Sequence, residues 1–411
     1  MRSASRQAFD WRHFLAAIGP GLAVMLADTE SGSVITVAQS GARWGYRLLL
    51  LQFVLIVPLY LVQELACRLA LGTGKGYVEL IRLRFGRNIS ALAVLVLATS
   101  CVGTLVTEMS GLAGIGQLFG VPVWQTAVVL IVAVLAMVLT GSYRTVERMV
   151  IGLGLFELAF IGVAWHAGPH PDAIVAQLAD LPLADRDYLY LVAANLGTSV
   201  MPWAIVYQQS ALMDKGLGIE HLRIARFDVQ LGAIICQAVT AAVLVASAAS
   251  FSAQSPVHLE SVAQVASAFT AVLGPDYGRL VFAAGVGGGS LVAMIVVCLT
   301  GAWATGELTG ARHSLEHHPF EAPWFYATLA VMLIAGGALV VGGINVVRLS
   351  IGIGVVNAIL LPVVLGLLYL LARRELRGSL RIEGAYAAVL AIVFFITAAT
   401  GLYAGLVGAF G

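Results

Sequence analysis

The chain has 411 residues, of which 60% are hydrophobic and only 11% charged, and it contains 45 glycines. This composition excludes a soluble domain, because repeated apolar runs of about 18 or more residues are typical of membrane-spanning helices. The net charge of +1 gives no reason to expect nucleic acid or another polyanion as a partner. No Walker-type phosphate loop and no motif for hydrolysis or group transfer is found, so neither an ATP-driven pump nor an enzyme is predicted.

The apolar runs predict an all-α integral membrane protein with eleven transmembrane helices in a single domain, 1–411. The predicted spans are 14–40, 47–71, 90–118, 122–140, 147–167, 189–212, 229–250, 278–306, 323–345, 350–372 and 384–408.

Lys and Arg residues indicate the orientation of these spans. If the N-terminus is cytoplasmic, all of the 23 Lys and Arg residues lie on the inner side except Arg43, Arg47, Arg186, Arg279 and Arg348. The positive-inside rule then places the N-terminus inside and the C-terminus outside. We expect a bacterial inner (plasma) membrane. Arg2, Arg6 and Arg12 precede the first span without a small-residue cleavage site, so no cleavable signal is predicted.

The first span is interrupted by charged residues. It reads FLAAIGPGLAVMLADTESGSVITVAQSGA over 14–42, and Asp28-Thr29-Glu30-Ser31-Gly32 joins its two apolar halves. A continuous helix would place two carboxylates in hydrocarbon, at a cost of at least a few kcal/mol each. Thr, Ser and Gly favour leaving the helix at this point. We therefore predict a broken helix whose unwound centre carries a carboxylate site.

A second interruption lies in the sixth span. Gly197, Thr198 and Ser199 weaken the helix, and Pro202 cannot donate a hydrogen bond to the preceding turn. Two broken helices, each the first of five spans, indicate inverted repeats over 14–167 and 189–372, with 384–408 added outside them. The alternative is structural, since Gly and Pro also occur in membrane helices that carry no site.

Oxygen atoms at the first break would suit a cation, because the last carbonyls of a helix lack partners and carry partial negative charge. Asp28 is the first candidate ligand. Glu30 is a second carboxylate that could line the cavity or instead form a salt bridge or face a solvated vestibule. Met201 could offer its carbonyl or its thioether, or simply pack in the core.

Other ionisable residues lie in or near the spans. Glu64 and Arg68 are four residues apart on one helix and are expected to pair. Glu108 and Glu157 have no evident local partner, so each could line a vestibule, relay protons or make a structural hydrogen bond.

The motifs together resemble the NRAMP family of divalent-metal transporters over nearly the whole chain. GPGLAVMLADTESGS stands where that family has a Gly-Pro-Gly start and an Asp-Pro-Gly-Asn metal motif. The run 73–85, the segment 143–147 and Met201-Pro202-Trp203 resemble further family motifs, the last in place of Met-Pro-His. The resemblance implies a LeuT-like architecture of five plus five inverted helices, with helices 1 and 6 broken.

This sequence departs from the family at several positions. Asp28 is kept, whereas Thr29, Glu30 and Ser31 replace the family's Pro, Gly and Asn. Trp203 replaces a histidine associated with proton movement, and no arginine occurs in the ninth span. These departures resemble a divergent branch, the NRAMP-related magnesium transporters (NRMT-like), and imply weak or absent proton coupling.

The resemblance therefore implies uptake of Mg²⁺ and/or Mn²⁺ by alternating access. Asp28 would be the principal ligand, Thr198 and Met201 would contribute from the second break, and Ser31 and Glu30 would shape the site. Asn357, in the tenth span, could hold a coordinated water. No cofactor beyond the transported ion and no obligate protein partner is predicted; the bilayer is the expected surrounding.

Two other functions stay open at the level of the sequence. An organic-cation or amino-acid symporter on the same fold would pair Asp28 with an ammonium group and stack its substrate on Trp203. A non-transporting metal sensor is the other, although the inner loops are too short to carry an output domain.

Overall fold

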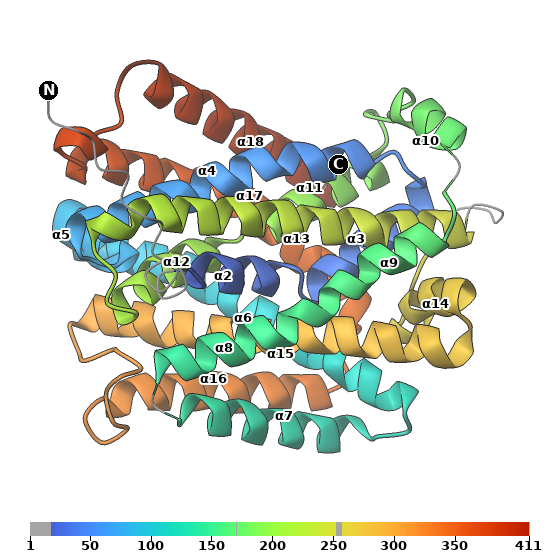
Figure 1. Cartoon of the computed structure of the whole chain (residues 1–411), viewed down its shortest axis with the longest axis horizontal. Coiled ribbons are helices and arrows are strands. Elements are labelled where there is room, and N and C mark those ends of the chain that lie inside the picture. Colours follow the sequence, from blue (N-terminus) through green and yellow to red (C-terminus); the bar gives the residue numbers. More distant parts are fainter. Residues whose placement is uncertain (1–17, 141, 170, 252–256, 411) are drawn as a thin grey trace, which may run out of the picture.

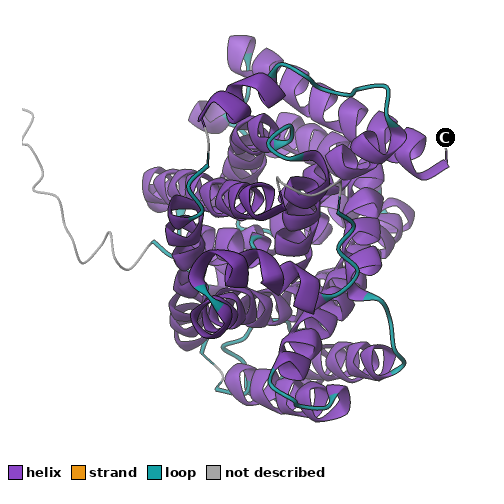
Figure 2. Ribbon diagram, turned by 90° about the vertical axis from the view of Figure 1, so that its right-hand side faces the viewer, coloured by secondary structure: helices purple, strands orange, loops and turns teal. Residues whose placement is uncertain are grey.

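The computed structural model describes residues 18–140, 142–169, 171–251 and 257–410. Arg2, Arg6, Arg12 and the beginning of the first predicted span lie outside these ranges. The described residues form helices joined by short loops, with no strand among them (Figure 2). The all-α prediction is confirmed.

Most predicted spans correspond to long helices that run side by side along the long axis of the molecule (Figure 1). They are α4 (Leu49–Thr73), α6 (Arg87–Leu118), α7 (Val123–Val138), α8 (Tyr143–Gly154) continued by η1 (Leu155–Leu158) and α9 (Ala159–His166), α13 (Leu222–Phe251), α15 (Pro275–Thr309), α16 (Pro323–Val341), α17 (Val346–Glu375) and α18 (Gly384–Phe410).

Within the described residues, nine helical segments are long and apolar enough to cross a membrane. The predicted span 122–140 forms the apolar helix α7 of 16 residues, which is shorter than that criterion. The span 14–40 divides into two shorter helices. A count of eleven spans therefore remains a prediction.

Both predicted breaks are present. The first helix divides into α2 (Pro20–Asp28) and α3 (Ser31–Trp44), and the sixth into α11 (Arg186–Ser199) and α12 (Pro202–Asp214). In Figure 1, α2 and α12 lie on the side of the molecule that carries α5 (Tyr77–Phe85), and α3 lies towards the opposite end. The two broken helices thus run in opposite directions, as inverted repeats require, while the repeat boundaries stay predictions.

Three short helices were not predicted: α5, α10 (Pro171–Leu178) and α14 (Val262–Leu273). Each helix is shorter than the apolar run of a membrane span, so the hydropathy pattern does not reveal it. In α14, Ser261 caps the first turn, and Phe269 packs its ring 5.0 Å from that of Phe160. In α5, the first turn donates the Val78 backbone N–H to Glu307 of α15 at 2.9 Å.

Glycine allows the helices around the second break to touch. A Cβ on Gly354 of α17 would stand 2.7 Å from the carbonyl oxygen of Ala194 in α11, and 3.0 Å from the Thr198 methyl group. Such close approach is the usual role of small residues where helices pack in a membrane.

The predicted Glu64–Arg68 pair is also confirmed, with 2.7 Å between Oε1 and Nε.

Candidate metal site

Asp28 is the last residue of α2, and its carboxylate is almost completely buried, at 1% exposure. Neither carboxylate oxygen has a hydrogen-bond partner among the described residues. The end of α2 places unpaired carbonyl groups beside it, and their partial negative charge opposes a second negative charge. A buried carboxylate in such surroundings is costly unless a cation compensates it. Asp28 is therefore a candidate cation ligand.

The Ser33 hydroxyl connects the two breaks. Its Oγ lies 2.6 Å from the Asp28 carbonyl oxygen and 3.3 Å from the Thr198 carbonyl oxygen. A serine hydroxyl has a single hydrogen, so it donates to one of these carbonyls at a time. The structure thereby brings the backbone of Asp28 next to that of Thr198, from segments 170 residues apart in the chain.

Met201 and Asn357 occupy the second break and its neighbour. Met201 is the N-cap of α12 in an extended conformation, and its carbonyl oxygen accepts a 3.2 Å bond from the Ala204 N–H. Asn357 lies one turn after Gly354 on α17, the helix that contacts Thr198, and its buried Oδ1 has no partner among the described residues. Both residues are buried, so a carbonyl, a thioether and an amide oxygen are available in this region.

Glu30 has a different role from Asp28, because it caps its own helix. Its carboxylate accepts the backbone N–H groups of Gly32 at 2.7 Å and Ser33 at 3.1 Å. Ser31 likewise donates its backbone N–H and its hydroxyl to Oε2 of Glu108, both at 2.9 Å. Glu30 and Ser31 thus have partners within the protein, which favours their predicted role of shaping the site over direct coordination.

Glu157 is a further buried carboxylate beside the break. It lies in η1, a short 3₁₀ segment between α8 and α9, and accepts a hydrogen bond from the Thr29 hydroxyl on Oε2. Mid-helix 3₁₀ segments are often functional. The described residues contain no group of three or more His, Cys, Asp or Glu side chains placed to hold a metal ion. A metal at Asp28 would therefore need carbonyl, amide or thioether ligands as well.

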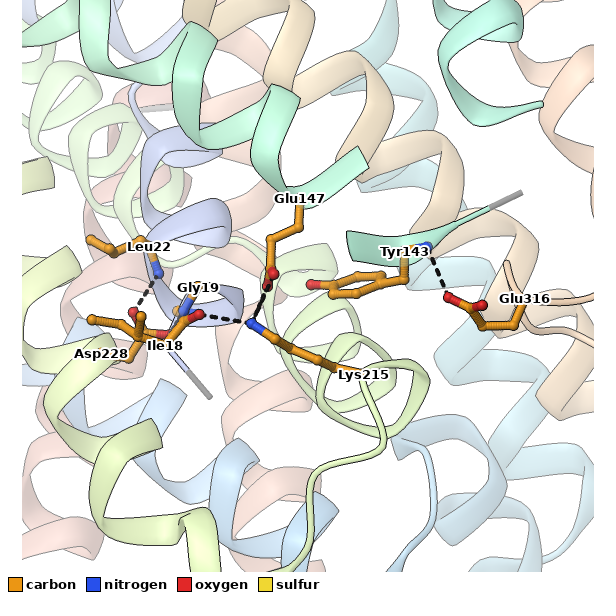
Figure 3. A network of polar contacts seen from close by, with 9 residues as sticks. Ile18, Gly19, Leu22, Tyr143, Glu147, Lys215, Asp228 and Glu316 are labelled. Carbon is orange, nitrogen blue, oxygen red and sulfur yellow. Dashed lines mark hydrogen bonds and ion pairs between the residues drawn. The ribbon is translucent and has the colours of Figure 1, made fainter. Parts of the chain in front are cut away.

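The beginning of α2 is fastened by Asp228 of α13. Its carboxylate accepts the backbone N–H groups of Gly19 at 2.9 Å, Gly21 at 2.7 Å and Leu22 at 3.2 Å (Figure 3). These are three of the N–H groups that the first turn of a helix leaves without partners. The absence of a side chain at Gly21 lets α13 approach, since a Cβ there would stand 2.8 Å from the Val229 nitrogen.

A buried ion pair completes this attachment. Lys215, directly after α12, donates to the Ile18 carbonyl oxygen at 2.7 Å and pairs with Glu147 of α8 at 2.7 Å (Figure 3). The two side chains are only 3% and 7% exposed. Sequence analysis missed this network, because its members come from four distant segments and share no local pattern.

Structural neighbours match nearly the whole chain. A mutant of the Eremococcus coleocola manganese transporter superposes with a TM-score of 0.76 at 18% identity, covering 100% of this chain and 90% of the other. Mhp1, a nucleobase-cation-symport-1 family transporter, gives a TM-score of 0.60 at 14% identity, covering 95% and 90%. Together with the two broken helices, these likenesses define an integral membrane protein of the LeuT-like fold.

Sequence comparison places the chain within that class. The family described as Natural resistance-associated macrophage protein-like (Nramp) matches residues 21–406. The chain belongs to the Nramp family.

Curated relatives match a smaller share of the chain. The divalent metal cation transporter MntH of Yersinia pestis is 30% identical over 286 residues, 68% of each chain. The protein of the same name from Brucella suis is 25% identical over 292 residues, 68% of this chain and 64% of the relative. The match to Bacillus subtilis MntH spans 59% of both chains at 28% identity. The chain thus spans less than two thirds of the latter two relatives.

Proposed function

We propose that this protein carries divalent metal ions, Mg²⁺ and/or Mn²⁺, into the cytoplasm by alternating access. One observation carries the proposal: Asp28 holds a buried carboxylate without a hydrogen-bond partner at the negative end of α2. The names of the relatives, divalent metal cation transporter and manganese transporter, support a divalent ion. In this proposal the α5 end of the bundle faces the cytoplasm.

Asp28 acts as the principal ligand, and the Thr198 and Met201 carbonyls contribute from the second break. Asn357 reaches the ion directly or through a water. Glu30 and Ser31 shape the site by holding the first turn of α3 in place. A single carboxylate with neutral oxygens suits a hard, partly hydrated ion such as Mg²⁺, whereas the Met201 sulfur would favour Mn²⁺.

Proton coupling is weak or absent in this proposal, and the protein belongs to the NRMT-like branch. Trp203, buried at the second break, cannot carry a proton as histidine does. The ion's own gradient and the membrane potential then drive uptake, at about 2.3 kcal/mol per charge per 100 mV.

Proteoliposomes test the site. We expect wild-type protein to import Mn²⁺ and Mg²⁺. Asp28→Asn keeps the shape of the side chain but removes its charge, and it should lose at least about 90% of the initial rate of import. The reason is that about 1.4 kcal/mol of lost ion-binding free energy already lowers the affinity tenfold. Asp276→Asn is the matched control, since Asp276 is exposed at the start of α15. Wild-type rates in Asp28→Asn would refute the assignment.

A pH-sensitive dye inside the same vesicles tests the coupling. We expect no acidification of the lumen when metal is added. Clear, metal-dependent proton entry would overturn this part of the proposal while leaving metal transport intact.

A further inference from the structure

A groove lies at the end of the bundle that carries α5 (Figure 1), where α5, the beginning of α6 and the end of α15 meet. Its volume is about 450 Å³, and it is lined by Arg82, Arg87, Ala91, Leu308 and Thr309. Among these described lining residues there is no carboxylate, so the groove carries two positive charges without a counter-charge of its own. Its charge therefore favours an anionic occupant.

The charge of the groove comes from Arg82 and Arg87. Arg84, which is exposed on the same helix as Arg82, pairs with Glu375 at 3.6 Å between Nε and Oε1. In the described part of the chain, no ion pair joins Arg82 or Arg87 to a carboxylate. Arg82 donates from Nη1 to the Leu308 carbonyl oxygen at 3.0 Å, which holds its side chain at the groove. A guanidinium group has five N–H donors, so Arg82 keeps further donors for a ligand.

The predicted membrane spans place this groove at the depth of the lipid headgroups. Arg87 precedes the span 90–118 by three residues, and Thr309 follows the span 278–306 by three residues. At the rise of an α-helix, three residues correspond to about 5 Å. The headgroup layer extends about 5–7 Å beyond the hydrocarbon on each side, so both residues fall within it.

An apolar stripe of α6 leads from the groove towards the hydrocarbon. Arg87, Ala91 and Leu95 are spaced four residues apart, so they lie on one face of the helix. Ala91 is exposed, and its small side chain leaves the groove open on this face. Leu95, one turn further on, is 64% exposed. The face therefore changes from a charged end at headgroup depth to an apolar surface that acyl chains would cover.

We propose that this groove binds an anionic phospholipid, with Arg82 and Arg87 holding the phosphate and an acyl chain lying along Ala91 and Leu95. Guanidinium groups bind phosphate oxygens through paired N–H donors, and basic pockets between membrane helices suit such headgroups. The beginning of α6 adds partial positive charge, because no side chain caps this helix end. A soluble phosphate ion would satisfy the arginines but would leave the apolar stripe unused. The bound lipid would join α5 and α6 to the end of α15.

Thermal unfolding of the purified full-length protein in a non-ionic detergent tests this site without any divalent ion, so the result does not depend on metal transport. A ligand that binds only the folded state raises the unfolding temperature according to its concentration and affinity. We expect added phosphatidylglycerol to raise it relative to phosphatidylcholine at the same mole fraction. In Arg82→Gln/Arg87→Gln, the mole fraction for the half-maximal shift should rise by about tenfold or more, since two charged donors are lost.

Matched variants separate a site from general surface attraction. Arg144→Gln/Arg223→Gln removes two exposed arginines on the same predicted side of the membrane, so it changes the net charge equally and should keep the wild-type response. Ala91→Phe fills the groove without changing the charge and should weaken the response. It also tests the site if the variant that lacks Arg82 does not fold. Inorganic phosphate, added at the same concentration as the lipid phosphate, should give no shift.

Several outcomes would overturn the inference. Equal unfolding curves of the wild type in phosphatidylglycerol and phosphatidylcholine would show that no anionic lipid is preferred. A wild-type response in Arg82→Gln/Arg87→Gln or in Ala91→Phe would place the lipid elsewhere. An equal loss in Arg144→Gln/Arg223→Gln would show attraction to the whole charged surface. A shift with inorganic phosphate as large as that with phosphatidylglycerol would make the ligand a free anion and not a lipid.

Discussion

Replacing Lys215 by methionine should loosen the attachment of the first turn of α2, which Asp228 alone would then hold. Lys215→Met keeps the length of the side chain but removes its charge and its bond to the Ile18 carbonyl. It also leaves the Glu147 carboxylate, 7% exposed, without its cation. Any conformation that moves α2 away must break the bond from Lys215 to the Ile18 carbonyl in wild type but not in the variant.

The structure sets the magnitude of this effect. A hydrogen bond to a charged group contributes about 1.5–3 kcal/mol, and the bond from Lys215 to the Ile18 carbonyl is the one that is lost when α2 is released. The Glu147–Lys215 ion pair joins α8 to the residue after α12 and does not involve α2, so only the bond to Ile18 shifts the balance, and the lower value of about 1.5 kcal/mol applies. At 1.4 kcal/mol per factor of ten, the balance between attached and released α2 should shift by roughly tenfold.

Cysteine labelling measures this shift directly, because all four native cysteines are buried. Ala23 of α2 is fully buried, so Ala23→Cys should react with a maleimide only when α2 is released. We expect Lys215→Met to raise the labelling rate by roughly tenfold. The added change Glu147→Met removes the buried charge but not the loss of the bond to Ile18, so it should restore little of the protection.

Lys75→Met is the control for this experiment, because the Lys75–Glu79 pair is exposed, with 3.5 Å between Nζ and Oε1. Exposed pairs contribute about 0–1 kcal/mol, so the labelling rate should change little. If Lys215→Met labels no faster than Lys75→Met, the bond from Lys215 to Ile18 does not hold α2 and the reasoning is wrong.

Three further variants test the breaks. Ser33→Ala removes the hydroxyl between them and should weaken Mn²⁺ binding in calorimetry by about three- to tenfold, the value of one hydrogen bond; unchanged binding would show that this hydroxyl does not position the site. Glu30→Gln keeps a neutral cap and should lower the stability by about 1 kcal/mol while Mn²⁺ still binds; a loss as complete as in Asp28→Asn would make Glu30 a ligand. Gly354→Ala should lower the unfolding temperature by overpacking against Ala194, whereas Gly366→Ala, with no neighbour within 4 Å, should raise it through helix propensity; the opposite order would contradict the close contact of α11 and α17.

The amino-acid sequence determined the all-α fold and the position of both broken helices. Hydropathy is a local property, and each long helix forms its backbone hydrogen bonds within its own segment. The runs of apolar residues therefore suffice to locate the long helices. The charges of Asp28 and Glu30 and the ring of Pro202 likewise act on the segments that contain them. The short helices α5, α10 and α14 escaped prediction, because their stability comes from caps and from packing on other helices.

Tertiary structure alone decided what each carboxylate does. Asp28 and Glu30 are carboxylates only two residues apart, yet the first ends α2 without a partner among the described residues and the second caps α3. Glu108 and Glu157 gained their partners from the first break, far away in the chain. Hydrogen-bond partners and helix ends depend on packing between distant segments, so no local pattern could separate the carboxylates that lack a partner from those that the protein itself satisfies.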